Sequence, residues 1–519
     1  MLRSRPVLWL SVFIFPPFAL VLLWMRGDLG VLRRIAGTLA ICVVAIVELF
    51  YVYGMHILWD GNVKPYGVSF ASRSRHDALV EATRARQRVE RPPQQAALVE
   101  TAKSLPPAAA PSLSAPASSK PAMTVREKPE PAGYWTDFRG PNRAGVYAET
   151  AIETAWPATG LPRLWKQPIG AGYASFTVAE GRAYTIEQRR DREAVTAYDV
   201  RTGRELWAFT YPALFEEVLG GPGPRATPVY HEGLIYSVGA NGDFYCLSAE
   251  TGKPKWSKNI LADNGAKNMR WAMSGSPLIV DEKVIVTPGG ADGKSIVAYN
   301  RLSGESLWHS LNDRAGYTSP ILATLAGRTQ IVWISAERAV GLAVEDGKQL
   351  WAFPFPAQMD MNCSQPVVVD ETHVLLSSAP GPGAAMLEIA KTGDGYAARP
   401  VWQNNRMKNK FNSSVLYQGY IYGLDEAILA CIDAKTGELK WKGGRYGYGQ
   451  LLLAGSHLIV LTEQGDVVLV RATPEGHQEL ARFSAIEGRT WNIPAIDNGL
   501  LLVRNSTEMA CFRLGKMAQ

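Results

Sequence analysis

One tryptophan motif recurs through the C-terminal part of the chain and constrains its fold more strongly than any other feature. In each copy a Thr, Ser or Asp precedes a Gly, and a Trp follows four residues after that Gly. The Gly accepts positive φ and the preceding oxygen caps the turn, so each copy predicts a β-hairpin. The copies that align without gaps are AYDVRTGRELW (197–207), CLSAETGKPKW (246–256), AYNRLSGESLW (298–308), GLAVEDGKQLW (341–351) and CIDAKTGELKW (431–441).

A second hairpin pattern lies upstream of each motif, as in ATPVYHEGLIYSV from Ala226 and GSPLIVDEKVIVT from Gly275. Each unit therefore contains four short antiparallel strands. The tryptophans or their degenerate equivalents recur every 39 to 52 residues. Four strands at this period are typical of propeller blades. We predict an all-β fold for residues 134–519, an eight-bladed β-propeller of four-stranded antiparallel blades.

The last predicted blade ends at Cys511 without a fourth strand. The segment LPRLWKQPIG (161–170) precedes the first full blade and carries Trp165. If this segment completes the last blade, the ring closes and neither end of the array exposes an unpaired edge.

The motif resembles the tryptophan-docking repeat of the pyrroloquinoline quinone (PQQ) propeller family, and AYDVRTGRELW matches that repeat at every defined position. The segment YWTDFRGPNRAGV (134–146) is also similar to the lead-in of secreted or membrane-tethered bacterial members. The resemblance implies that each indole packs on the turn Gly of its own motif, which places Trp207 against Gly203. It also implies that Cys246, Ala298 and Cys431 are the small first residues against which neighbouring indoles pack. The implied docking residues are Trp165, Trp207, Trp256, Trp308, Trp351, Trp402 and Trp441.

The N-terminal region differs sharply in composition. Residues 7–25 carry no charge and residues 35–59 carry only one acid and one histidine, so each reaches the roughly 20 apolar residues of a membrane span. A cleaved signal peptide is the alternative for the first stretch, but no small-x-small site follows it. We predict a transmembrane helical hairpin over 1–60 and a disordered Ala/Pro-rich linker over 61–133, with a short helix at 76–91 as an option within it.

This anchor predicts a multi-pass protein of the inner (cytoplasmic) membrane. The positive charges conflict over its orientation. The family resemblance favours a propeller on the periplasmic side. The chain has a net charge of +6, yet residues 1–133 carry seven surplus positive charges and the propeller is close to neutral. Nucleic acid is therefore not an expected partner.

Chemistry-bearing motifs are sparse. The five cysteines include no CxxC pair, and Cys246, Cys431 and Cys511 share a strand context that predicts buried apolar positions. The segment PGGADGKS (288–295) resembles a phosphate-binding loop only at its end, and a strand rather than a helix follows it. No metal site or catalytic residue is predicted.

One constellation remains at the predicted entries of the innermost strands, where a propeller has its central channel. Convergence of Arg, Asn and aromatic side chains on a funnel suits a planar or anionic ligand, although strand starts also use polar residues to satisfy backbone groups. The ligand-binding candidates are Arg225, Arg270, Trp271, Asn362, Asn412, Tyr448 and Trp491.

We therefore expect a membrane-tethered, non-catalytic binding or scaffold module of the cell envelope, with an envelope protein or polymer as its partner. The alternative is a divergent PQQ-dependent (quinoprotein) dehydrogenase. The resemblance implies PQQ and Ca²⁺ only for that alternative, because the adjacent cysteine pair of the dehydrogenases is absent and their calcium ligands have no matching motif here.

Overall fold

A computed structural model describes residues 12, 16–51, 55–61, 64–69, 73–89, 134–393 and 395–515. The chain divides into two compact units, residues 1–79 and 80–519. The two units are described separately.

The first unit contains two helices, a two-stranded sheet and the beginning of a third helix. These are α2 (Pro16–Trp24), α3 (Val31–Tyr51), β1 (His56–Trp59), β2 (Pro65–Ser69), which pairs antiparallel with β1, and α4 (Arg73–Val89). The indole Nε1 of Trp24 donates to Thr38 Oγ1 at 3.1 Å, which joins α2 to α3.

The predicted localisation as a multi-pass protein of the inner membrane is wrong. Among the described residues, no helix combines the length and the hydropathy of a membrane span. Helix α3 has Arg33 and Arg34 near its start and Glu48 near its end. The prediction of a multi-pass inner-membrane protein, with its propeller on the periplasmic side, fails with these spans. Residues 7–11 and 13–15 of the first predicted span, 52–54 of the second, and 62–63, 70–72 and 90–133 of the predicted linker lie outside the described residues.

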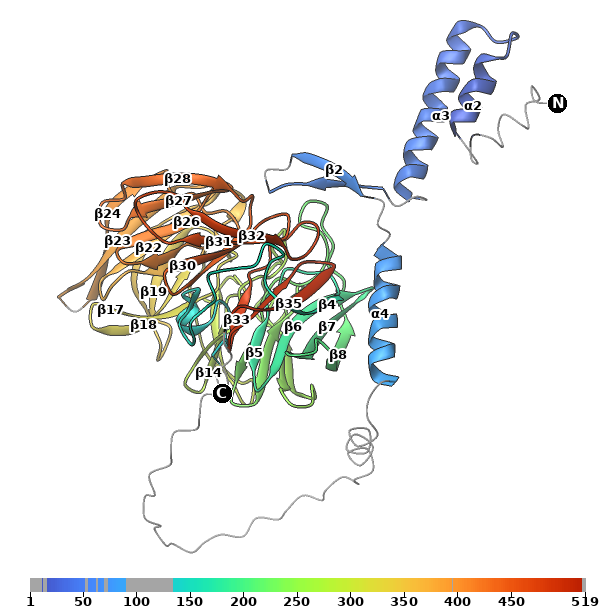
Figure 1. Cartoon of the computed structure of the whole chain (residues 1–519). Coiled ribbons are helices and arrows are strands. Elements are labelled where there is room, and N and C mark those ends of the chain that lie inside the picture. Colours follow the sequence, from blue (N-terminus) through green and yellow to red (C-terminus); the bar gives the residue numbers. More distant parts are fainter. Residues whose placement is uncertain are drawn as a thin grey trace, which may run out of the picture. The chain divides into compact units, whose positions relative to one another are not determined.

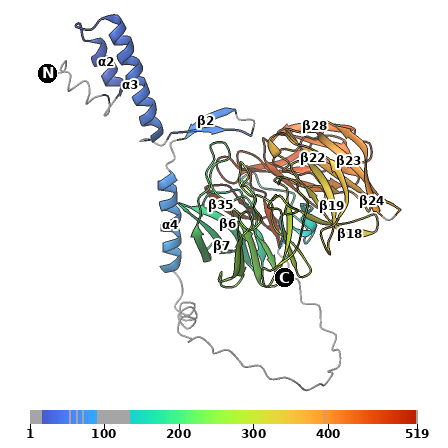
Figure 2. The same cartoon turned by 180° about the vertical axis from the view of Figure 1, so that it is seen from behind.

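The second unit is an eight-bladed propeller, as predicted, with its blades in chain order around a ring (Figures 1 and 2). Blades 1 to 4 are β5 (Thr177–Ala179), β6 (Arg182–Arg189), β7 (Arg192–Asp199), β8 (Glu205–Pro212); β9 (Val229–His231), β10 (Leu234–Val238), β11 (Asp243–Ser248), β12 (Pro254–Asn259); β13 (Leu278–Val280), β14 (Lys283–Val286), β15 (Ile296–Asn300), β16 (Ser306–Ser310); and β17 (Ile321–Leu325), β18 (Arg328–Ile334), β19 (Arg338–Ala343), β20 (Gln349–Pro354).

Blades 5 to 8 are β21 (Val367–Val368), β22 (His373–Ser378), β23 (Gly383–Thr392), β24 (Gly395–Asn404); β25 (Val415–Tyr417), β26 (Tyr420–Asp425), β27 (Ile428–Asp433), β28 (Leu439–Arg445); β29 (Gln450–Ala454), β30 (His457–Leu461), β31 (Asp466–Arg471), β32 (Glu479–Ser484); and β33 (Ala495–Asp497), β34 (Leu500–Arg504), β35 (Glu508–Arg513), β4 (Arg163–Pro168). The short helices η1 (Pro141–Arg143) and η2 (Gln358–Asp360) and strand β3 (Val146–Tyr147) complete the elements of this unit.

The ring closes as the sequence predicts. Strand β4 precedes the first blade in the chain but pairs antiparallel with β35 of the eighth, with Trp165 opposite Cys511. The last blade therefore has four strands. The closing strand removes the edge that an open array would expose.

The predicted partner of each indole is wrong. Trp207 lies opposite Ala197 of its own motif, but its ring packs on Gly252 of the next blade, and its Nε1 donates to Ala249 O at 3.0 Å. Gly203 faces Trp165 instead. The glycines of blades 3, 4 and 6 likewise face the tryptophan of the preceding blade, in the pairs Gly304 with Trp256, Gly347 with Trp308 and Gly437 with Trp402. In these motifs the small first residue thus lies opposite the tryptophan of its own motif, whereas the glycine packs against the tryptophan of the preceding blade.

The cysteines follow from this arrangement. Cys246, Cys431 and Cys511 are free and fully buried, which confirms the predicted core role. They lie opposite Trp256, Trp441 and Trp165 respectively, at the position where blades 1, 3 and 4 have Ala197, Ala298 and Gly341.

Helix α4 reaches the second unit in its C-terminal half, where Arg84 contacts blades 8 and 1. The Arg84 side chain, 1% exposed, donates to Gln167 Oε1 at 2.9 Å and to Pro168 O at 2.7 Å. It also lies over the Tyr198 ring and 3.5 Å from a carboxylate oxygen of Glu205. This half of α4 is therefore an integral part of the propeller surface.

The contact between a glycine and the neighbouring indole can be tested within one blade. Gly252 and Gly233 both have positive φ, 69° and 75°. A Cβ on Gly252 would lie 2.5 Å from the Trp207 ring, whereas a Cβ on Gly233 would meet nothing within 4 Å. Both Ala variants carry the backbone strain, so the difference between them isolates the steric contact. We expect Gly252→Ala to be less stable than Gly233→Ala by about 1 to 3 kcal/mol in thermal or urea unfolding. Equal stabilities would mean that the indole does not pack tightly between blades.

Candidate functional site

A collar of hydrogen bonds joins the entries of the innermost strands around the channel. The residue two positions before most inner strands carries a side-chain oxygen that accepts the backbone N–H of the corresponding residue in the preceding blade. The links are Ser175 N to Thr227 Oγ1 (2.9 Å), Thr227 N to Ser276 Oγ (3.0 Å), Ser276 N to Ser319 Oγ (2.9 Å), Ser319 N to the Gln365 side-chain oxygen (3.0 Å) and Gln365 N to Ser413 Oγ (3.0 Å).

Blades 7 and 8 complete the collar with a different residue. The Gln450 amide Nε2 donates to Phe411 O at 2.9 Å and to Trp491 O at 2.8 Å, which bridges blades 6 and 8. Ser175 Oγ donates to Ile493 O at 2.5 Å and joins blade 8 to blade 1. The channel therefore has two ends, one formed by residues that precede the collar and one by the inner strands that follow it.

Aromatic rings from four blades meet at the first end, which we call the rim. Trp491 lies 5.3 Å from Tyr173 and 4.8 Å from Phe411, and Phe411 lies 5.9 Å from Tyr448. Trp271 and Tyr317 form a further pair at 6.0 Å. The first four rings come from the neighbouring blades 6, 7, 8 and 1 and contact one another, so this part of the rim is occupied by protein side chains.

Cations cover these rings. The Arg489 guanidinium lies 4.3 Å from the Trp491 ring centroid and donates to Tyr173 Oη at 2.7 Å. Arg225 stacks on Tyr173 and Phe215, and Lys410 lies over Phe411 and Tyr448. Cation–π contacts of this kind are strongest for tryptophan. The rim is therefore both aromatic and positively charged.

Among the described residues, Arg225 is one of three predicted candidates with a buried polar atom that lacks a hydrogen-bond partner, together with Asn362 and Asn412. Arg225 as a whole is partly buried. In the described structure its Nη1 atom is fully buried without a hydrogen-bond partner, and its Nη2 atom donates to Gly221 O at 2.7 Å. Burial lowers the pKa of Arg225 to about 10, and Tyr173, Glu217 and Glu193 partly oppose this effect.

The other predicted residues divide into two groups. Arg270 is exposed, lies over the Trp271 ring at 5.0 Å, and stands with Trp271, Tyr448 and Trp491 at the rim. Asn362 and Asn412 are buried, as Tyr448 is, but they contact loops rather than the rim. Asn362 donates to Ser335 O and Phe355 O, and Asn412 accepts from Asn409. These two amides hold loops together, as polar residues at strand entries often do.

Sequence reasoning missed Arg489, Phe411, Lys410 and Tyr317, which complete the rim. Each of them lies one or two positions from a predicted residue or precedes an inner strand. The position of a residue just before an inner strand was therefore the signal that could have revealed them.

The rim does not fit the calcium and quinone of a quinoprotein. The carboxylates of Glu463 and Glu217 already accept hydrogen bonds from the protein. Glu463 accepts from Trp491 Nε1 at 2.8 Å and from Tyr448 N at 3.1 Å. Glu217 accepts from Leu219 N and Gly220 N. Among the residues with described positions, no group of three His, Cys, Asp or Glu side chains could hold a metal ion.

The lead-in segment, residues 134–147, occupies the second end of the channel. Its backbone accepts from Val178 of blade 1 and Tyr230 of blade 2, and β3 pairs parallel with β29 of blade 7. The Tyr134 and Trp135 amides donate to Asp497 Oδ1 of blade 8.

Two arginines of the lead-in segment extend this contact to the collar. Arg143 donates to Ser276 O, Pro277 O and Pro320 O, and it pairs with Asp137 at 2.9 Å. Arg139 donates to Ser414 O at 3.2 Å. The lead-in segment thus makes hydrogen bonds to seven of the eight blades and plugs this end.

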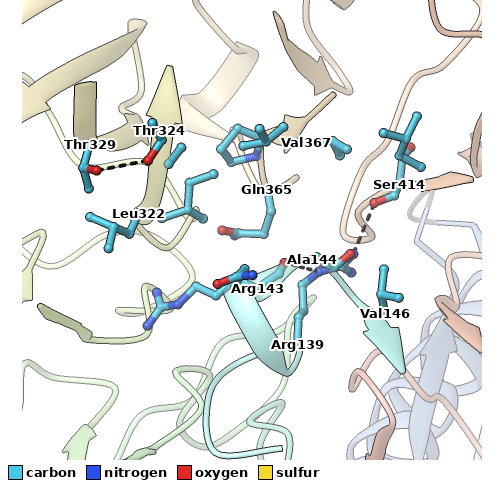
Figure 3. Close-up of a pocket in the computed structure, with 16 residues that line it drawn as sticks. Arg139, Arg143, Ala144, Val146, Leu322, Thr324, Thr329, Gln365, Val367 and Ser414 are labelled. Atoms are coloured by element: carbon cyan, nitrogen blue, oxygen red, sulfur yellow. Dashed lines mark hydrogen bonds between the residues drawn. The ribbon is translucent and has the colours of Figure 1, made fainter. Parts of the chain in front are cut away.

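A pocket of about 640 Å³ remains between the lead-in segment and the inner strands of blades 4, 5 and 6 (Figure 3). Its lining includes Arg139 and Arg143 from the lead-in segment and Leu322, Gln365 and Val368 from the blades. Sequence reasoning noted this segment only as a lead-in and named neither arginine.

The fold and the repeat define a PQQ-like β-propeller. Residues 191–443 match the family model described as "Outer membrane protein assembly factor BamB".

Individual relatives point in two directions. The outer membrane protein assembly factor BamB of Burkholderia pseudomallei is 21% identical over 346 residues, which cover 62% of this chain and 79% of that protein. A "1-butanol dehydrogenase (cytochrome c)" of Thauera butanivorans is 30% identical over 105 residues, 19% of this chain and only 14% of the dehydrogenase. The crystal structure of BamB from Moraxella catarrhalis superposes with a TM-score of 0.50 at 14% identity, over 69% of this chain and 99% of that one. That likeness establishes the fold alone.

The anchorage of the lead-in segment should depend on pH through Asp497. Burial and the nearby Glu149 raise the pKa of Asp497 from 3.8 to about 6. Because the folded state holds this proton more tightly than the unfolded state, the stabilisation is complete below about pH 4 and declines as pH rises through about 6. Asp497→Asn keeps an oxygen for the Tyr134 and Trp135 amides but cannot ionise. We expect Asp497→Asn to gain stability relative to the native chain between pH 4 and 8, by up to about 2 to 3 kcal/mol in urea titrations. The control is Asp292→Asn at an exposed turn. A difference that does not change with pH would contradict the assignment.

Proposed function

We propose that this protein is a non-catalytic binding module that holds a protein partner in the cell envelope, and that the rim is its binding surface. The observation that carries the proposal is the cluster of aromatic rings and cations at the rim. Aromatic residues and arginine are the side chains most enriched at protein interfaces. The similarity to BamB supports a partner that takes part in outer-membrane protein assembly.

The contacts within the rim favour a protein over an enclosed small molecule. Trp491 already contacts Tyr173, Phe411 and Arg489, so its ring is engaged by neighbouring side chains. A partner would lie across this filled surface. The positive charge of Arg225, Arg489, Lys410 and Arg270 favours an acidic or carbonyl-rich partner surface.

The second candidate, a quinoprotein dehydrogenase, draws its support from the match to the butanol dehydrogenase. That match covers 14% of the dehydrogenase, and the carboxylates at the rim are occupied by protein donors. The binding module therefore accounts for more of the rim geometry.

Site-specific crosslinking in intact cells tests the proposal. Arg270 precedes β13 at the rim, and Asp281 follows the same strand at its other end, and both are exposed. A photoreactive amino acid at position 270 should yield an adduct with an outer-membrane assembly protein, identified by mass spectrometry. The same amino acid at position 281 should yield none. Equal adducts from the two positions would contradict a rim interface.

The same purified chain also tests the enzyme alternative, for which the binding module predicts a negative result. Titration with PQQ and Ca²⁺ should give no saturable heat and no dye-linked alcohol oxidation. Saturable binding together with oxidation would replace the binding module by a dehydrogenase.

A further inference from the structure

The pocket beside the lead-in segment combines an apolar wall with a buried charge that lacks a counterion. The inner strands β17, β21 and β25 form the wall. Leu322 and Val368 are both 36% exposed on it, and Leu416 lies beside them. The hydroxyls of Thr324 and Thr329 bind each other at 3.0 Å, so they do not require a further partner (Figure 3).

Arg139 supplies the charge. Its side chain is 1% exposed and lines the pocket, with its guanidinium end directed toward Ser414 in Figure 3. Its Nε donates to Arg143 O at 3.3 Å, and its Nη2 donates to Ala144 O and Ser414 O at 3.3 and 3.2 Å. The Nη1 atom is buried and has no hydrogen-bond partner in the described part of the chain.

The two arginines of the lead-in segment differ in one respect. Arg143 is equally buried but has the Asp137 carboxylate at 2.9 Å, whereas the acceptors of Arg139 are all neutral carbonyls. Burial lowers the pKa of Arg139 to about 10. A buried cation without an anion is costly, and its burial is normally offset by a paired charge.

The backbone keeps this guanidinium in place. Gly145 has φ 72°, and a Cβ at this position would lie 2.3 Å from Arg139 Nη2. The glycine therefore leaves the space that the guanidinium occupies beside the pocket. The guanidinium with its unpartnered Nη1 is thus held beside the pocket.

We propose that this pocket binds a small amphipathic monocarboxylate, whose carboxylate pairs with Arg139 and whose apolar chain lies on Leu322, Val368 and Leu416. A single unpartnered nitrogen calls for one negative charge. Charge-assisted bonds between guanidinium and carboxylate are roughly twice as strong as neutral ones. A volume of about 640 Å³ lies within the range of small-molecule sites.

Calorimetry on the full chain, with three probes, tests both halves of the ligand. Octanoate carries the charge and the apolar chain, 1-octanol carries the chain alone, and acetate carries the charge alone. We expect octanoate to bind at least tenfold more tightly than either of the others. It should also raise the melting temperature of the protein, because it binds the folded state.

A matched pair of variants locates the site. Leu322→Asp places a negative charge on the pocket wall and should weaken octanoate binding at least tenfold. Leu439→Asp makes the same change at a leucine of similar exposure, 42%, on the outer strand β28, and should leave the affinity unchanged. Arg139→Gln should abolish the preference for octanoate over 1-octanol. If Arg139→Gln does not fold, the two leucine variants still decide.

Three results would overturn the proposal. The first is equal affinity for octanoate and 1-octanol, which would leave no role for Arg139. The second is an equal effect of the two leucine variants, which would place the ligand elsewhere. The third is the absence of both heat and a thermal shift with millimolar octanoate.

Discussion

The collar of hydrogen bonds at the inner-strand entries is the constraint on which the rest of the propeller depends. Eight short strands converge there, and their backbone groups would otherwise face the channel unpaired. Side-chain oxygens of blades 2 to 6, from Thr227 round to Ser413, accept the N–H of the preceding blade, and the Gln450 amide spans the remaining gap by donating to two carbonyls. Because each link joins two blades, the collar fixes the distance between neighbouring blades at the channel.

The collar also explains where the lead-in segment binds. The backbone N–H groups of the collar are bound within the ring of blades. The backbone carbonyls of Ser276 and Ser414 instead accept from Arg143 and Arg139 of the lead-in segment. Arginine suits this role because its fork of donors reaches several carbonyls at once. The plug is therefore built onto the collar. The pocket is the space left at blade 5, where the lead-in segment crosses without spanning the full width of the channel.

The parts of the fold that sequence reasoning predicted are those that local patterns determine. A Gly turn, alternating strands and a period near 44 residues suffice to predict blades, and the missing fourth strand after Cys511 predicts closure by β4. The glycine that receives each indole was assigned wrongly. Gly203 and Gly252 stand in equivalent motifs, so only the three-dimensional placement of adjacent blades decides which of them receives Trp207. Hydropathy alone likewise overestimated the second predicted span, because helix α3 begins at Val31 and thus includes Arg33 and Arg34, which the predicted span 35–59 leaves out.

The candidate site was predictable only where it follows from topology. Trp271, Tyr448 and Trp491 were found because strand entries meet at the channel. Asn362 and Asn412 satisfy the same rule, yet they bind their own loops. Arg139 lies 275 residues from Ser414 in the sequence, so no local pattern could reveal that its guanidinium lacks a counterion.

The seam between blades 8 and 1 shows why long-range closure relies on charge. Arg504 of β34 is fully buried and donates to Thr185 Oγ1 at 2.6 Å and to Gly170 O at 3.0 Å, across more than 300 residues of sequence. Burial opposes ionisation of Glu187, but Arg189, Arg84 and Arg504 outweigh it and lower the pKa of this carboxyl. Directional contacts of this kind specify one partner blade, which apolar packing between similar blades does not.

Arg84 ties helix α4 to the same network. It contacts Glu205, which also pairs with Arg189, and it stacks on Tyr198, whose hydroxyl donates to Glu187. Removing one member of a buried ion network leaves its partner uncompensated, at a cost of about 3 to 5 kcal/mol. The docking of α4 and the closure of the ring therefore draw on one set of buried charges, so loss of the helix contact would weaken the seam that holds the first and last blades together.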